Sequence, residues 1–256
     1  MKDLAFIKVN DYKNICDKVR EKTGSTENLK AEEIPAKIDE VYAGGKTDGN
    51  REMWDNLTAN NTRMDIGLLF AQSKFDYIRP PYKLVPTAEG TLNQTFFKAK
   101  KLKKIESAYF DFSNKKRGTF ASVALHYTFN SCTSLEEIED IGLQPDFTLA
   151  NTFSWSGIKK IACIRVDENM KYDAAFTGCP KLEEVTFEGV IGQNGLSFAD
   201  SPLLTKESLL NIIGCLKDYS TDTSGTSHTV TLGQTNLDKL TSDEKAIATQ
   251  KGWSLL

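Results

Sequence analysis

The segment Thr95–Ile105 reads TFFKAKKLKKI, Thr128–Ile138 reads TFNSCTSLEEI, and Ala175–Val185 reads AFTGCPKLEEV. All three share one pattern: a small residue, Phe, two variable residues, a small residue, two variable residues, Leu, two variable residues, and Ile or Val. Self-similarity at a fixed period indicates a repeat architecture, in which each copy is one structural unit. This pattern therefore decides the predicted fold.

Further copies extend the repeat on both sides. The segment 152–161 fits with one residue deleted before Ile158, and the copy that begins at Ser197 departs from the pattern after Leu204. The phenylalanines that anchor the copies, including a degenerate first one, are Phe70, Phe96, Phe129, Phe153, Phe176 and Phe198. Subtracting neighbouring numbers gives spacings of 26, 33, 24, 23 and 22. Leucine-rich repeats span about 20–29 residues, and the long interval indicates an insertion around residues 113–125.

A single unit of this length cannot bury its own apolar side, so neighbouring units must stack. The anchoring Phe and the Leu or Ile that follows it are predicted to fill the interior. A small residue three positions after Phe permits close stacking: Ala99, Cys132, Ser156, Cys179 and Ser201. The next short segment in each copy (IESAYF, IEDIGL, IACIRV or VTFEGV) is predicted to be a strand, paired with its neighbours about 4.8 Å away.

The predicted fold class is α+β: a leucine-rich-repeat solenoid with one short strand per repeat, an N-terminal helical hairpin and a C-terminal α/β cap. The predicted domains are an N-terminal helical module (1–45), a linker (46–60), the repeats (61–204) and the cap (205–256). A solenoid needs such a cap because its last repeat would otherwise expose apolar surface.

The charged pair before each predicted strand alternates in sign along the chain. The pairs are Lys103-Lys104, Glu136-Glu137, Lys159-Lys160 and Glu183-Glu184. Stacked in register, each cationic pair would face an anionic pair, whereas identical pairs would repel each other. The alternative interpretation is that these are unrelated pairs on a solvated face.

The N-terminal segment 10–43 is predicted to form the helical hairpin. Gly24 suits the left-handed C-cap of its first helix, and Pro35 is tolerated only near the first turn of its second. The glycine-rich stretch 44–50 predicts a flexible linker, and 51–57 a short helix before the repeats.

Three capping or alternation signals define the C-terminal cap. Thr205 suits the N-cap of an amphipathic helix that extends through Leu216. The segment 228–232 alternates like a strand. Thr241 begins a capping box for another helix, and residues 253–255 are predicted to add a last strand.

Composition and motifs favour a non-catalytic protein without a cofactor. The net charge of −3 gives no basis for nucleic-acid binding. We expect no membrane segment and no signal peptide, so synthesis in the cytoplasm. The five widely spaced cysteines predict reduced thiols, with neither a disulfide framework nor a metal site. His126 and His228 lie outside any nucleophile motif, so no catalytic residue is predicted.

Binding through the surface of the stack is the predicted use of this architecture. If Ile138, Ile141 and Leu143 form the buried set, equivalent outward positions are Tyr109, Arg165 and Asp167. The residues predicted beside them on the turns are Tyr127, Trp155 and Tyr172. Aromatic residues and arginine are favoured at contact hot spots. The structural alternatives are that Trp155 plugs the shortened turn and that Tyr172 packs on its neighbour.

The F-x-x-C-x-x-L-x-x-I units, over about Phe70–Leu204, resemble the BspA-like leucine-rich repeat family of bacterial surface and phage-derived proteins. The segments 15–38 and 207–253 are similar to modules of tail and minor structural proteins from phages of Gram-positive bacteria. These resemblances imply a tail-associated virion protein. Its partners would be other tail proteins, through the N-terminal module, and a host cell-surface protein or glycan.

Other functions remain open at this level. One alternative is a bacterial protein-interaction or adhesion module that is not part of a virion. A carbohydrate-cleaving enzyme would need two facing carboxylates, which the sequence does not favour. The sequence leaves homo-oligomerisation open, since no long heptad run requires it.

Overall fold

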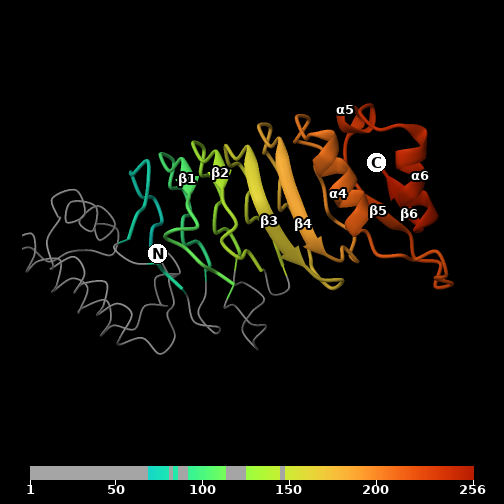
Figure 1. Ribbon diagram of the computed structural model, residues 1–256, viewed down its shortest axis with the longest axis horizontal. Coiled ribbons are helices and arrows are strands. Elements are labelled where there is room, and N and C mark those ends of the chain that lie inside the picture. The colour runs from blue at the N-terminus through green and yellow to red at the C-terminus, as the bar shows by residue number, and fades with distance from the viewer. Residues whose placement is uncertain (1–68, 81–82, 86–91, 114–124, 145–147) are drawn as a thin grey trace, which may run out of the picture.

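A computed structural model describes residues 69–80, 83–85, 92–113, 125–144 and 148–256. Over these ranges the chain is a mixed α/β protein with a four-stranded parallel sheet, followed by helices and a two-stranded sheet (Figure 1). The predicted N-terminal helical module, the linker and most of the predicted insertion lie outside the described residues.

One strand begins at the second residue of the charged pair of each aligned unit. The strands are β1 (Lys104–Ile105), β2 (Glu137–Ile138), β3 (Lys160–Val166) and β4 (Glu184–Gly189), in the order β1-β2-β3-β4. All neighbours are parallel, and the second residue of each charged pair is in register with the next. The strands therefore lie side by side in chain order (Figure 1).

The first two strands are shorter than the sequence predicts. The N–H of Glu139 still donates to the carbonyl of Ile105 at 3.0 Å, as a parallel ladder requires. The next N–H in the ladder, that of Ser107, donates to the side-chain carboxylate of Glu139 at 2.8 Å instead of to a backbone carbonyl. Pairing between β1 and β2 stops there because a side chain has taken the place of the backbone acceptor.

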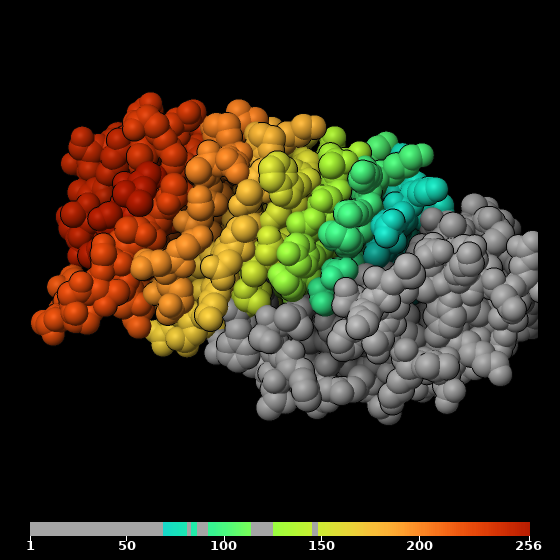
Figure 2. All heavy atoms as spheres, turned by 180° about the vertical axis from the view of Figure 1, so that it is seen from behind, coloured from blue at the N-terminus to red at the C-terminus, as the bar shows by residue number. Residues whose placement is uncertain are grey.

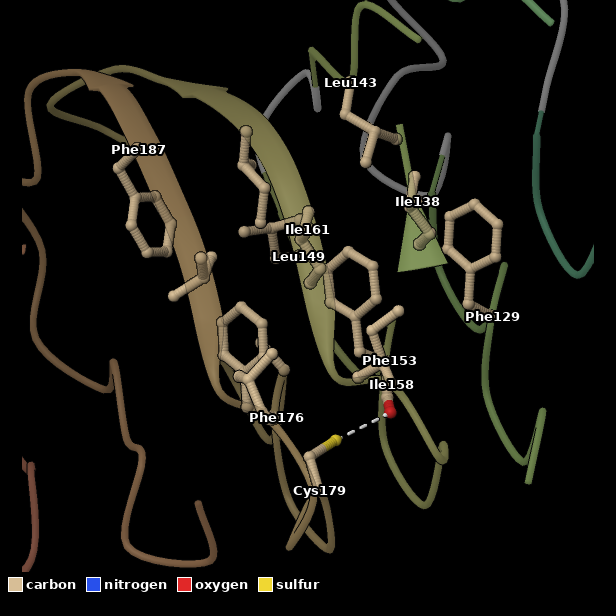
Figure 3. Packing of buried hydrophobic residues seen from close by; sticks show 14 of the residues in the cluster. Phe129, Ile138, Leu143, Leu149, Phe153, Ile158, Ile161, Phe176, Cys179 and Phe187 are labelled. Atoms are coloured by element: carbon tan, nitrogen blue, oxygen red, sulfur yellow. Dashed lines mark hydrogen bonds between the residues drawn. The ribbon is translucent and has the colours of Figure 1, made fainter. Parts of the chain in front are cut away.

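The anchoring phenylalanines form one continuous stack, here called the phenylalanine stack. Its ring centroids are 5.4 Å apart for Phe70–Phe96, 5.3 Å for Phe96–Phe129, 5.6 Å for Phe129–Phe153, 5.2 Å for Phe153–Phe176 and 4.7 Å for Phe176–Phe198. All six rings are buried. The predicted superposition of Phe129, Phe153 and Phe176 is confirmed (Figure 3).

Hydrogen bonds join the same turn of successive units. The N–H of Phe129 donates to the carbonyl of Thr152 at 2.9 Å, and the N–H of Phe153 donates to that of Ala175 at 3.0 Å. The thiol of Cys179 donates to the carbonyl of Phe153 at 3.0 Å (Figure 3). Buried polar groups that lack partners destabilise a fold, so these bonds allow the units to stack closely. Successive units appear as adjacent bands in Figure 2.

Helix α4 (Lys206–Cys215) closes the free edge of the sheet beside β4. Its predicted N-cap is confirmed, because the Thr205 hydroxyl accepts the N–H of Ser208 at 3.2 Å. The Asn211 side chain then substitutes for the backbone of a further strand. Its Oδ1 accepts the N–H of Phe187 at 2.7 Å, and its Nδ2 donates to the Phe187 carbonyl at 3.1 Å.

The remainder of the cap agrees with the predicted elements. Strands β5 (His228–Val230) and β6 (Trp253–Leu255) are parallel, and Thr241 forms the capping box of α6 (Ser242–Gln250). The short helix α5 (Gln234–Leu237) was not predicted. The N–H of Phe198 donates to the Thr231 carbonyl at 2.7 Å, which connects the last unit of the phenylalanine stack to the cap.

Replacing Asn211 by Ala should lower the free energy of unfolding by about 1–2 kcal/mol, because the Phe187 N–H would lose its partner at the sheet edge. Urea unfolding would measure this loss. Asn211→Asp keeps an acceptor for the Phe187 N–H but removes the donor to the Phe187 carbonyl, so it should recover at most part of the loss. An Ala variant as stable as the parent protein would show that the Asn211 hydrogen bonds do not close the edge.

Candidate functional site

The exposed face of the parallel sheet carries rows of paired charges. Lys104 Nζ lies 2.8 Å from Glu137, and Lys160 Nζ lies 2.5 Å from Glu184. A neighbouring row contains the 3.3 Å pair between Lys159 and Glu136. The predicted facing of opposite charges is confirmed for these pairs. Exposed ion pairs contribute about 0–1 kcal/mol each, so their larger effect is to disfavour a shifted register.

Arg165 lies on this face between two carboxylates. Its guanidinium nitrogens donate to both oxygens of Asp140 at 2.8 and 2.9 Å, and its Nε lies 3.2 Å from Glu188. Hydrogen bonding to Arg165 lowers the pKa of Asp140 to about 2. Arg165 was predicted to contact a ligand, but in the structure its donors are already directed to carboxylates of the neighbouring units.

The carboxylate of Glu139 is likewise held by an ion pair and by hydrogen bonds to a neighbouring unit. Its carboxylate lies 2.7 Å from Lys104 Nζ and accepts both the N–H and the hydroxyl of Ser107, at 2.8 and 2.7 Å. These bonds favour the ionised form, with that to Lys104 having the largest effect, and they lower the pKa of Glu139 to about 2.

This depressed pKa predicts an acid-sensitive contribution to stability. An unfolded glutamate has a pKa of about 4.3. Ionised Glu139 therefore stabilises the fold above that pH, and its contribution is lost as the pH falls towards 2. Glu139→Gln should lower Tm at pH 7 by about 1–3 °C, since the pair is partly solvent-screened.

The difference between Glu139→Gln and the parent protein should shrink between about pH 4 and pH 2. Thermal melts followed by circular dichroism would measure it, with the exposed Glu183→Gln as a control that leaves Tm nearly unchanged. A difference that stays constant down to pH 2 would contradict the assignment.

The other two predicted sheet-face residues have local structural roles. Tyr109 is half-buried and packs against the hydrophobic core, and its carbonyl accepts the N–H of Leu84 at 2.8 Å. The carboxylate of Asp167 accepts the N–H of Asn169 at 2.8 Å, which stabilises the turn after β3. In these interactions Tyr109, Arg165 and Asp167 each contact a different neighbour.

The assignment of Tyr172 to the surface is wrong. Its side chain is 1% exposed, and burial raises the pKa of its hydroxyl. The reason is positional: Tyr172 lies four residues before its anchoring Phe, where three other units place buried leucines. That buried set is Leu92, Leu125, Leu149 and Tyr172. Tyr172 therefore packs in the core, and the sequence alignment four residues upstream of each Phe could have revealed this.

The two remaining candidates lie on the turns beside the phenylalanine stack, and both have left-handed backbones. Tyr127 (φ 58°) packs against His126 and Phe97, with ring centroids 4.1 and 6.1 Å away. Trp155 (φ 60°) is 62% exposed. Trp155 is thus the predicted binding residue that the structure leaves most open to solvent.

Gly178 and Asp200 are neighbours of Trp155 that sequence reasoning missed. Trp155, Gly178 and Asp200 each follow an anchoring Phe by two positions, in three successive units. A Cβ at Gly178 would lie 2.5 Å from the Trp155 ring, and Asp200 accepts the N–H of Gly178 at 2.8 Å. The common slot was a usable signal, but neither residue matched the search for aromatic residues and arginine.

The structure also bears on metal and thiol chemistry. Cys132, Cys163, Cys179 and Cys215 are free thiols, and burial raises the pKa of Cys132 to about 12. A thiol with a raised pKa is a poor nucleophile and metal ligand at neutral pH. Among the described residues, no three His, Cys, Asp or Glu side chains gather in a way that could hold a metal ion.

No helix within the described ranges is long and apolar enough to span a membrane.

The chain was compared with models of known protein families, with curated proteins and with solved structures. None of the three comparisons gave a match.

Proposed function

We propose that the chain is a leucine-rich-type repeat solenoid that acts as a non-catalytic binding scaffold. The observation that carries this proposal is the phenylalanine stack, in which one residue of each unit packs on its counterpart 4.7–5.6 Å away. The parallel strands and the repeated turn hydrogen bonds support it, because they recur at the same position of each unit. Stacked repeats of this kind offer an extended surface whose outer residues can vary without disturbing the core.

We further propose that this scaffold is a tail-associated component of a phage or prophage particle. The support is the resemblance of segments 15–38 and 207–253 to modules of phage structural proteins. The N-terminal module would attach to other tail proteins, and the solenoid would face a protein or glycan of the host surface.

The paired charges on the sheet suggest which surface is used. Because Lys104, Lys160 and Arg165 already contact carboxylates, a ligand on that face would have to break existing ion pairs. The turn side, which includes Trp155, has an exposed aromatic side chain instead. We therefore assign ligand binding to the turn side of the solenoid.

Particle purification tests the tail proposal. A prophage carrying this coding sequence would be induced, its particles banded on a density gradient, and the protein sought by mass spectrometry. We expect the protein to band with the particles at a constant ratio to a tail protein. Its consistent absence from intact particles would overturn the virion proposal and favour an interaction or adhesion module outside a virion.

A further inference from the structure

The side chains of Trp155 and Asp200 lie against the same glycine of the unit between them. Because Gly178 (φ 66°) has no side chain, the six-membered part of the indole rests directly on its backbone. The N–H of Gly178 is bound by Asp200 Oδ2 at 2.8 Å. Gly178 thus contacts the indole of the preceding unit and the carboxylate of the following unit.

The indole is presented to solvent as a supported platform. Trp155 occupies a slot that Lys98 and Ser131 fill in earlier units, so the fold itself does not require an aromatic residue there. Its backbone is fixed by the N–H bond to the Thr177 carbonyl at 2.8 Å. A large side chain with 62% exposure, held by the backbone below it, loses little conformational freedom when a ligand binds.

Asp200 differs from the carboxylates on the sheet in its ion pairing. Glu139, Asp140 and Glu188 each contact a lysine or arginine. Asp200 is exposed, and no cationic nitrogen of the described residues forms an ion pair with it. A carboxylate that pairs with none of these described cations, in the same slot of its unit as an exposed indole, attracts cations, and so does the indole.

We propose that Trp155 and Asp200 form a binding site for an arginine side chain of a partner protein. A guanidinium is planar, stacks on aromatic faces and donates two parallel hydrogen bonds to a carboxylate. Asp200 Oδ2 keeps its bond to Gly178 while the carboxylate accepts the guanidinium. This inference rests on the proposed binding function and specifies the chemistry of the ligand.

Titration of the full-length protein with N-acetylarginine amide tests the site. The indole N–H resonance of Trp155, assigned with a Trp155→Phe variant, would be followed by NMR. We expect a saturable shift that weakens as salt is added. N-acetylglutamine amide and a methyl glycoside, at the same concentrations, should produce no saturable shift. A glycoside that shifts the resonance as strongly as arginine would overturn the proposal in favour of a glycan ligand.

Replacing Asp200 by Asn removes the negative charge of the side chain and keeps its shape. Asparagine can still accept the Gly178 N–H, so the turn is kept, but arginine affinity should fall at least about tenfold. Glu184→Gln on the sheet face is the matched control and should leave arginine affinity unchanged. Unaltered affinity in Asp200→Asn, or no arginine-dependent shift in the parent protein, would overturn the proposal.

The result is independent of the particle test. Arginine binding without particle association would leave this site valid and remove the virion proposal. Particle association without arginine binding would support the virion proposal and overturn this site.

Discussion

Replacing Phe153 by Ala should lower the free energy of unfolding by about 3–5 kcal/mol. Phe153 is fully buried and stacks on Phe129 on one side and Phe176 on the other, so truncation leaves a cavity with aromatic rings on both sides. The flanking units are fixed by turn and strand hydrogen bonds, which limits collapse into the cavity. Equilibrium unfolding in urea would measure the loss.

Phe97→Ala is the matched control for this prediction. Phe97 directly follows an anchor, is half-buried and makes an edge contact with Tyr127. Replacing it by Ala should lower the free energy of unfolding by about 1 kcal/mol. Similar losses for Phe97 and Phe153 would contradict the special role of the phenylalanine stack.

Replacing Gly157 by Ala should destabilise the protein by about 2–3 kcal/mol. A Cβ there would lie 2.1 Å from the carbonyl oxygen of Thr133 in the preceding unit, so the backbones would have to move apart. The N–H of Gly157 also donates to the Cys132 carbonyl at 3.0 Å, and this bond would be strained by the movement.

Gly214→Ala is the corresponding control and should change stability in the opposite direction. Gly214 lies in α4, and a Cβ there would meet no atom within 4 Å. Alanine in a helix should stabilise by about 0.5–1 kcal/mol relative to glycine. Thermal and urea unfolding of both variants would compare the signs. A neutral Gly157→Ala would show that neighbouring units do not approach as closely as described.

The sequence predicted the elements whose signals are local. The alternating charged pairs located the start of each strand of the four-stranded sheet, and the capping signals at Thr205 and Thr241 located two helices of the cap. The one-residue deletion before Ile158 has its physical explanation in Gly157, because the shortened turn lies directly against the preceding backbone. Periodicity and capping depend on neighbours in the chain, so one sequence suffices to recognise them.

What the sequence could not provide were contacts between units that do not follow from the alignment of the repeats. The lengths of β1 and β2 depend on the Glu139 carboxylate reaching Ser107, and nothing local to either residue indicates that contact. The same holds for Arg165, whose outward position was predicted but whose pairing with Asp140 was not. Asp200 shares its slot with Trp155 in the sequence, but its hydrogen bond to Gly178 arises only when the units are stacked.

Aromatic NOEs in a sample with selectively labelled phenylalanine would test the proposed stack most directly. Ring-to-ring NOEs are expected between Phe129 and Phe153 and between Phe153 and Phe176, whose centroids are 5.6 and 5.2 Å apart. None is expected between Phe129 and Phe176. Three rings with no mutual NOEs, each in contact only with residues of its own unit, would contradict the shared interior on which the proposed binding scaffold depends.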